Sequence, residues 1–426
     1  MRKIMSEVTE SKQHQTQDTS SVFGKIGRLI RRYPARVAYC EPYWNVNTYQ
    51  VLFRDLMTFN IVEGRNVKKL ESALQSIFGV SELVTCSSGR LALEFALKSM
   101  GIKPGSEVVI PSFACDGVIQ PILRCDAIPV FAEIGEDLNV LPKAVEKALN
   151  DRTHSVIVPH LFGNPADIGE IVEICEPRGI KIIDDAAQAF GATIDNKWLG
   201  TFGDIGVHSF GNGKVCFGTG GGILVTQNLE YIARVKEFAW GQCNAKEIIG
   251  NALHTLTMRK WRRWSFPLER LTLGRRKQQK EAYPVAPMAN LNAGVALSLL
   301  KTIDKNIDAR RQRAKAYRGY LDKVDQLRLV EHKKGSVCLT QPIIVGGHDA
   351  RQTAELIRDA LNDNGYEINM SYKPLHLKPS FRPYLKEPLD YTDQVWDKII
   401  ELPCEPSVSF NEVKRISEII LSFVRG

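Results

Sequence analysis

The sequence predicts an α/β protein whose main domain is built on a mainly parallel, mixed sheet. Short runs rich in β-branched residues alternate with segments of helical periodicity, and 44% of the residues are apolar, enough for a large core. The strand-like runs are 107–113, 128–134, 154–162 and 180–186, and the helical segments beside them include 90–101 and 144–150. Strands separated by helices need crossover connections, which make neighbouring strands parallel. Ligands of such sheets bind where the strands end, so candidate chemistry is expected just after these runs.

The length of 426 residues indicates more than one domain. We expect a large domain over residues 51–290 that carries the sheet. Residues 291–426 are expected to form a long helix, from about 290 to 325, followed by a smaller α+β domain that mixes strands and helices.

Two segments with basic stretches stand apart from this core: one precedes the large domain and the other is inserted in it. Residues 1–50 form an N-terminal extension, of which the first 21 are polar and predicted to be flexible. Residues 22–37 are basic with apolar positions, which suits either an anionic surface or a solvated arm. An insertion at 257–281 carries Trp261, Trp264 and many arginines, and suits either a lid or a surface insertion.

Composition excludes several classes of protein. The net charge of +8 is mild for this length and favours anionic ligands such as phosphates, without any nucleic-acid signature. No run of about 18 apolar residues occurs, so no membrane span is predicted. The nine cysteines are scattered and form no CxxC, which predicts neither a metal site nor a disulfide framework and suits a reducing cytoplasm.

The first candidate cluster is residues 86–90, directly before a predicted helix. Ser88 and Gly89 would expose backbone N–H groups at the positive end of the helix dipole, where a phosphate binds readily. Arg90 adds a charged fork. The ordinary alternative for Ser-Ser-Gly is a helix N-cap without a ligand.

The second cluster, Asp184-Asp185-Ala186-Ala187-Gln188, ends a predicted strand. A carboxylate at a strand end can meet a ligand, pair with a protonated ring nitrogen, bind metal, or cap a helix. The metal interpretation lacks an accompanying His or Cys cluster.

The third cluster runs from Ser209 to Lys214 and is followed by the glycine-rich run 218–222 and a strand. A lysine in a glycine-flanked turn can approach a cofactor closely, and partial desolvation lowers the pKa of an amine enough to make it a nucleophile. A surface lysine is the alternative. A fourth cluster, 372–376, has no chemical meaning on its own.

The order of these clusters indicates more than any one of them. A phosphate cup, then an acidic residue after a later strand, then a serine and a lysine, is the set of parts that pyridoxal 5'-phosphate (PLP) needs. The cup anchors the phosphate, the carboxylate keeps the pyridine nitrogen protonated, and the lysine forms the covalent link and moves protons. The sequence therefore predicts a PLP enzyme with Lys214 as the cofactor-binding lysine.

With these residues in place, the chain resembles the DegT/DnrJ/EryC1/StrS family of PLP-dependent sugar aminotransferases over roughly residues 50–426. The motifs that carry the resemblance are SSGRLALEFAL, GIKPGSEVVIPSF, HLFGNPADI, IIDDAAQAFGA, LGTFGDIGVHSF with Lys214, GTGGGILVT, PLHLKP and ELPCEPSVSFNEV. The resemblance implies the aspartate-aminotransferase-like fold (fold type I) and a homodimer with shared active sites. It also implies transfer of an amino group, usually from glutamate, to a keto-sugar that is commonly nucleotide-linked.

The same resemblance assigns roles by position. Lys214 resembles the cofactor-binding lysine and general acid/base, and Asp185 the partner of the pyridine nitrogen. Gln188 matches the residue near the ring's phenolic oxygen. Ser209, with Ser88, Gly89 and Arg90, matches the phosphate cup.

Three positions depart from the family pattern. Cys115 stands where an aromatic residue usually stacks on the PLP ring, and Arg90 replaces a threonine. The Asn-x-Arg motif that reaches toward the phosphate across the dimer falls near 285–287 and is missing. We hypothesise that Arg90 replaces part of that lost positive charge.

These departures leave two alternatives beside a sugar aminotransferase. One is a PLP enzyme acting on a cyclitol or another non-sugar ketone. The other is a PLP-binding relative with a regulatory rather than a catalytic role. A screen of amino donors and ketone acceptors would separate them.

Overall fold

The computed structural model describes residues 36–37, 43–257, 283–368 and 370–424. The predicted flexible tail and nearly all of the basic insertion at 257–281 lie outside the described residues. No described helix combines the length and the apolar character that crossing a membrane would require.

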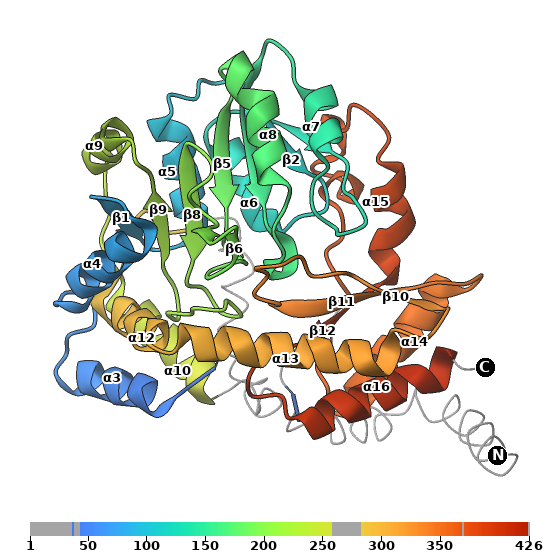
Figure 1. Ribbon diagram of the computed structural model, residues 1–426. Helices are drawn as coiled ribbons and strands as arrows, with labels where there is room; N and C mark the ends of the chain where they lie inside the picture. The colour runs from blue at the N-terminus through green and yellow to red at the C-terminus, as the bar shows by residue number, and fades with distance from the viewer. Residues whose placement is uncertain (1–35, 38–42, 258–282, 369, 425–426) are drawn as a thin grey trace, which may run out of the picture.

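A seven-stranded sheet with the order β1-β9-β8-β5-β4-β2-β3 forms the centre of the molecule (Figure 1). Only β9 runs against its neighbours, so the sheet is mixed but mainly parallel, as predicted. The strands are β1 (Leu83–Cys86), β2 (Glu107–Pro111), β3 (Ile128–Ala132), β4 (Thr153–Pro159), β5 (Lys181–Asp185), β8 (Ile205–Ser209) and β9 (Gly222–Val225). Every residue of β2 and β9 is buried, which explains why their sequences are apolar apart from Glu107 at the start of β2.

Helices cover both faces of this sheet. One face packs against α5 (Gly89–Ser99), α6 (Asp116–Arg124) and α9 (Leu229–Glu237). The other face packs against α4 (Asn66–Phe78), α7 (Pro142–Ala148), α8 (Ile168–Cys175) and α12 (Asn290–Leu300). A short hairpin of β6 (Thr193–Ile194) and β7 (Lys197–Trp198) follows β5. Because α5 and α6 follow β1 and β2, their N-termini lie where those strands end.

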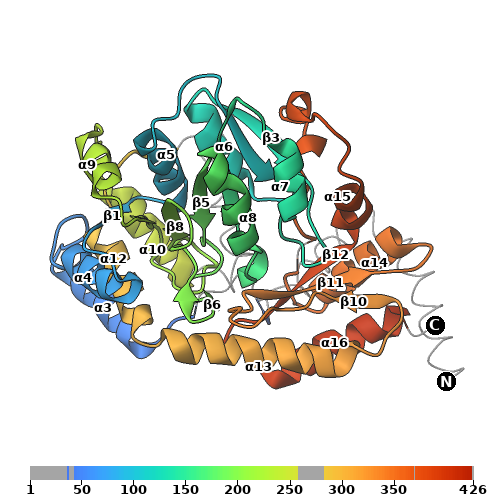
Figure 2. The same ribbon diagram turned by 45° about the horizontal axis from the view of Figure 1, so that its top comes forward.

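The C-terminal part has its own antiparallel sheet, with the order β10-β11-β12. Figure 2 shows α13 and α16 beneath this sheet, in contact with each other. The elements are β10 (Leu327–Leu329), β11 (Thr340–Val345), β12 (Ile399–Pro403), α13 (Ile303–Leu321), α14 (Ala350–Asp363), α15 (Asp390–Val395) and α16 (Phe410–Val424). This mixture of strands and helices is of the α+β kind expected there, and the domain boundary at residue 290 stays a prediction.

The prediction of a single long helix from about 290 to 325 is wrong in one respect. The structure has two helices there, α12 and α13. Thr302 has φ −123° and ψ 17°, outside the helical region. Its hydroxyl donates to the Leu299 carbonyl oxygen (3.2 Å) and accepts from Asn45 Nδ2 (3.3 Å). A threonine hydroxyl that binds a nearby carbonyl competes with the helical hydrogen bond and explains the break.

Two further helices, α3 (Val46–Met57) and α10 (Ala245–Thr257), lie outside the main layers (Figure 1). Helix α3 packs on α12 through Leu52 and through a bond between the hydroxyls of Thr48 and Ser298 (3.0 Å). Its opposite side is apolar and exposed.

Candidate active site

A cavity of about 1080 Å³ opens where parallel strands of the large sheet end. The residues that follow or end β1, β2, β4, β5 and β8 all reach it, which is the position expected for a ligand of such a sheet. Seven of the eight predicted site residues line this cavity: Gly89, Arg90, Cys115, Asp185, Gln188, Ser209 and Lys214.

The N-terminus of α5 and the end of β8 meet at one corner of the cavity. A side-chain carbon on Gly89 would lie 2.9 Å from Cβ of Ser209, so only glycine allows this approach. Ser88 Oγ accepts from the Leu91 N–H (3.3 Å) and caps the helix. Ser88 lines a neighbouring cavity of about 290 Å³ and is absent from the lining of the main one.

The glycine-rich run lets β9 lie directly against this corner. A side-chain carbon on Gly222 would lie 2.4 Å from the backbone carbon of Ser88. The Gly221 N–H donates to the Ser87 carbonyl oxygen at 2.9 Å. These glycines are thus explained by close backbone packing behind the helix N-terminus.

Asp184 and Asp185 point to opposite sides of β5, as successive residues of a strand do. Asp184 anchors a loop, since its carboxylate accepts from the N–H groups of Gly200 (2.7 Å) and Phe202 (3.0 Å) and from His160 Nε2 (2.7 Å). Burial alone would raise the pKa of Asp184, but His160 and these two N–H groups together hold it below its ordinary value.

Asp185 faces the cavity and has the opposite electrostatic balance. Burial raises the pKa of its carboxyl, and this outweighs a hydrogen bond from the Ala187 N–H (3.0 Å) and the charge of Lys214, which both lower it. A buried carboxylate with a raised pKa is stabilised when a cation is brought beside it. The site therefore suits a positively charged ligand group at this position.

Lys214 lies in the loop between β8 and β9 and lines the same cavity. Its backbone N–H donates to the Gly211 carbonyl oxygen at 3.3 Å, and the preceding Gly213 has φ 79°, which favours glycine. The glycine-flanked turn thus directs the lysine toward the strand ends, and the surface alternative is not what the structure shows.

Gln188 is fixed from two sides. Its Oε1 accepts from the Phe162 N–H (3.0 Å), and its Nε2 donates to the Tyr372 hydroxyl (3.2 Å). Tyr372 also lines the cavity, although its cluster has no evident chemistry in the sequence. The second domain thereby contributes to the site.

The segment after Tyr372 reaches the cavity because His376 is held from both sides. His376 is buried, and its ring nitrogens lie 2.6 Å from Ser112 Oγ and 2.9 Å from the Asp393 carboxylate. Lys378 then forms an ion pair with Asp116 and lines the cavity. The motif PLHLKP was the only sequence signal for these contacts, and it did not indicate their partners.

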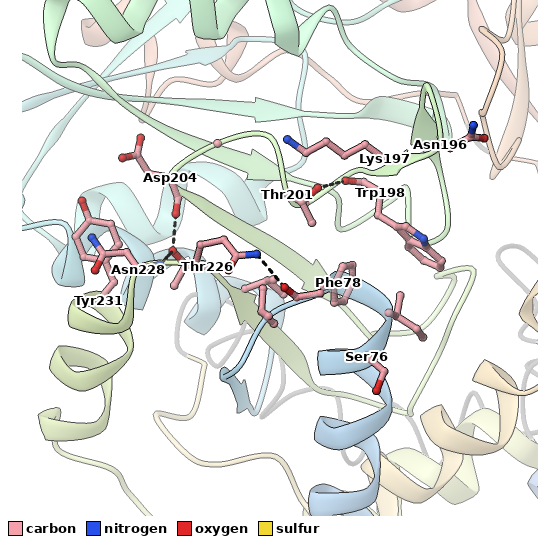
Figure 3. A pocket seen from close by; sticks show the side chains of 17 residues that line it. Ser76, Phe78, Asn196, Lys197, Trp198, Thr201, Asp204, Thr226, Asn228 and Tyr231 are labelled. Carbon is pink, nitrogen blue, oxygen red and sulfur yellow. Dashed lines mark hydrogen bonds between the residues drawn. The ribbon is translucent and has the colours of Figure 1, made fainter.

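Figure 3 shows a second cavity, of about 590 Å³, beside the amino end of β8 and the carboxyl end of β9. Two of its polar side chains are bound within the protein: Thr226 Oγ1 donates to the Asp204 carbonyl oxygen (2.7 Å), and Gln227 Nε2 donates to that of Gly79 (3.0 Å). None of the eight predicted residues, all of which the structure describes, lines it. The candidate chemistry therefore lies in the larger cavity.

Several proteins of known activity are similar to this chain. GDP-perosamine synthase of Vibrio cholerae is 28% identical over 377 residues, which cover 84% of this chain and 91% of that protein. UDP-N-acetyl-3-dehydro-alpha-D-glucosamine 3-aminotransferase of Acidithiobacillus ferrooxidans is 36% identical over 173 residues, covering 40% of this chain and 47% of that protein.

Among solved structures, the aminotransferase PseC of Helicobacter pylori has the same fold. Its TM-score is 0.76 at 19% identity, covering 91% of this chain and 99% of PseC. Residues 50–421 match the model of one family. The chain is thus a PLP-dependent aminotransferase and belongs to the DegT/DnrJ/EryC1/StrS aminotransferase family.

Proposed function

We propose that this enzyme transfers an amino group from glutamate to a keto-sugar linked to a nucleotide, with Lys214 as the residue that holds PLP. The observation that carries the proposal is the convergence of Lys214, Asp185, Ser209 and Gly89 on one cavity from three separate strand ends. When bound, PLP supplies an aldehyde that links to amines and a protonated ring that withdraws electrons from the substrate carbon.

The corner formed by Gly89 and Ser209 is proposed to hold the cofactor phosphate. The first N–H groups of α5 have no partner within the helix and carry its positive dipole end, so they suit a phosphate. Ser209 Oγ already accepts from the Gly211 N–H (3.3 Å) and keeps its own proton to donate. The role that we propose for Ser88 is limited to its capping contact with the Leu91 N–H. This contact orients the N–H groups at the start of α5.

The far end of the cofactor ring is proposed to meet Asp185. Its carboxylate would bind the protonated ring nitrogen and so keep that nitrogen charged. Gln188 would lie near the phenolic oxygen, with its orientation fixed by Phe162 and Tyr372. Cys115 caps α6 through the Gly117 N–H (3.4 Å) and would lie where relatives stack an aromatic ring.

Lys214 is proposed to act twice. Its amine would hold the cofactor covalently and, once free, would move a proton from the substrate carbon to the cofactor. Asp185 is buried, so water screens the attraction between its carboxylate and the charge of Lys214 less than it would at the surface.

The acceptor class comes from the relatives named above. The name of one contains a GDP-linked sugar product and that of the other a UDP-linked substrate. A nucleotide-linked sugar is what the two names share, so we propose a nucleotide-linked keto-sugar as the acceptor and leave its base open.

The donor half-reaction tests this proposal. The purified holoenzyme is mixed with L-glutamate, and the cofactor absorbance is followed as the aldehyde form converts to the amine form. Addition of GDP- or UDP-linked keto-sugar should restore the first spectrum, and glutamine and alanine serve as comparison donors. Conversion without return on any keto-sugar would favour a cyclitol or other ketone, and bound PLP without conversion would favour a regulatory relative.

We also propose a cytoplasmic homodimer. The scattered cysteines suit a reducing compartment. Helix α3 presents an exposed apolar stripe at spacings of three and four residues, made of Val46, Tyr49, Phe53 and Met57. Such a stripe on an outer helix marks a protein contact, and a second copy of the chain is the proposed partner.

Phe53→Asp should weaken the dimer by about 100-fold or more, because Phe53 is 67% exposed in the single chain and would be buried at the contact. Sedimentation velocity over a concentration series measures the shift to monomer. Leu356→Asp, on α14, is the matched control because Leu356 is also an exposed apolar helix residue. A monomeric wild type, or a dimer unaffected by Phe53→Asp, would contradict this interface.

A further inference from the structure

The catalytic cavity extends away from Lys214 along one side of α6. Its wall on this side is formed, in chain order, by Cys115, Gly117, Gln120 and Arg124. The nine residues of α6 span roughly 13 Å at the helical rise per residue. A ligand that reacts beside Lys214 and fills the cavity therefore reaches the last turn of α6.

A buried carboxylate fixes Arg124 at that far end. Arg124 Nε donates to Glu94 Oε2 at 2.8 Å, and Glu94 also accepts from the Tyr283 hydroxyl (2.7 Å) and from Lys98 (2.5 Å). Burial alone would raise the pKa of Glu94, but the bonds and charges of these partners hold it below its ordinary value, so Glu94 is ionised. A guanidinium has five N–H donors, and Nε supplies one of them.

A second guanidinium lies at the same place. Arg90 Nη1 donates to Gln120 Oε1 at 3.0 Å. Arg90 Cζ lies 4.9 Å and Arg124 Cζ lies 4.5 Å from the centroid of the Tyr283 ring. Tyr283 itself is buried and fixed by Glu94, so it gathers the two guanidiniums on one side chain.

The side chain of Arg90 passes close to Gly117 on its way to this position. A side-chain carbon on Gly117 would lie 3.4 Å from Arg90 Cγ and 3.6 Å from Cys115 Sγ. The stem of Arg90 therefore passes beside the small thiol of Cys115, where a large aromatic side chain would compete for space. Arg90 thus contributes its backbone N–H to the corner near Ser209 and its guanidinium to the far part of the cavity.

Among the described residues that line the cavity, four are positively charged and two are negatively charged. Lys378 and Asp116 neutralise each other, and the positive charge of Lys214 acts on the carboxylate of Asp185 without a described ion pair between them. Arg90 and Arg124 bring two positive charges, and the single carboxylate bound to Arg124, that of Glu94, is shared with Lys98. Paired guanidinium forks match the geometry and charge of phosphate oxygens better than any other common ligand group.

We propose that Arg90 and Arg124 bind the diphosphate that joins the sugar of the acceptor to its nucleoside. This inference rests on the proposed function, since it takes a nucleotide-linked keto-sugar as the substrate. The reacting sugar lies beside Lys214, and the diphosphate lies along α6 with Tyr283 behind the two guanidiniums. Arg90 and Arg124 thereby select acceptors that carry a diphosphate over free keto-sugars.

Calorimetric titration of the holoenzyme with UDP, GDP and inorganic pyrophosphate tests the proposal. Arg124→Gln and Arg90→Gln should each weaken diphosphate affinity by roughly 10- to 100-fold, the range for one charged hydrogen-bonding partner. Arg178→Gln is the matched control, because Arg178 is an exposed arginine paired with Glu146 outside the cavity, and it should bind like wild type. Wild-type affinity retained in both cavity variants would overturn the proposal.

Folding and function are checked separately. Arg124→Gln removes a partner of buried Glu94, so its unfolding midpoint is measured, and Arg90→Gln, which leaves the Glu94 contacts in place, must weaken binding independently. The wild-type donor half-reaction with glutamate separates the two proposals. A wild type that reacts with glutamate but binds no diphosphate overturns this inference alone, whereas diphosphate binding without a glutamate reaction overturns the proposed aminotransfer and leaves the anion site standing.

Discussion

Lys214→Ala should reduce the rate of amino transfer by about 10⁴-fold or more, because one side chain supplies both the covalent attachment of the cofactor and the proton transfer. Lys214 belongs to no described ion pair within the protein and is partly exposed, so the variant should fold normally. PLP should still bind through the phosphate corner near Ser209, without a covalent link.

Borohydride reduction followed by peptide mass mapping measures this directly. Wild type should carry a reduced cofactor adduct on Lys214, and the variant should carry none. Lys236→Ala is the matched control, since Lys236 pairs with Glu82 on the surface and lines none of the described cavities. An adduct on another lysine, or near-normal turnover by Lys214→Ala, would remove the basis of the proposed function.

The main sheet was predictable because its strands are buried on both faces. Such strands read as continuous β-branched runs between helical segments, and β2, β3, β4 and β5 lie within or overlap the four predicted runs. The break between α12 and α13 was not predictable from local sequence. It depends on the Thr302 hydroxyl, whose second partner is Asn45, 257 residues away in the chain.

The candidate site divides in the same way. Clusters that directly follow a strand, such as those of Asp185 and Lys214, were found because the topology brings strand ends together. Arg124 and Tyr283 lie in none of the quoted motifs, and Glu94 lies in SSGRLALEFAL without a role assigned to it. Their roles come from contacts between a helix, its neighbour and a loop nearly 160 residues further along the chain. Arginine, glutamate and tyrosine are common on protein surfaces, so their presence in a sequence does not indicate a site. Their grouping around Tyr283 is seen only in the folded structure.

Asp185→Asn should change activity and stability in opposite directions. Loss of the charge beside the ring nitrogen should lower the rate of amino transfer on the order of 10²- to 10³-fold, as removal of one electrostatic contact in a water-excluded site does. The folded-state pKa of Asp185 is raised by burial, so above its unfolded-state pKa its charge disfavours the folded state of the cofactor-free protein. The amide carries no charge, and the cofactor-free variant should therefore unfold at the same temperature as wild type or a higher one at pH 7.

Thermal unfolding with and without PLP, alongside turnover, tests both signs. Added PLP should stabilise wild type more than Asp185→Asn, because only the carboxylate gains from a protonated ring nitrogen. As pH falls through the ordinary carboxyl range, Asp185 becomes protonated in both the folded and unfolded states, and the advantage of the amide should disappear. Asp184→Asn is the matched control: its pKa is lowered and it anchors Gly200 and Phe202, so this variant should be destabilised at pH 7. If Asp185→Asn destabilised the cofactor-free protein as Asp184→Asn does, Asp185 would be a structural anchor rather than a carboxylate held ready for a cation.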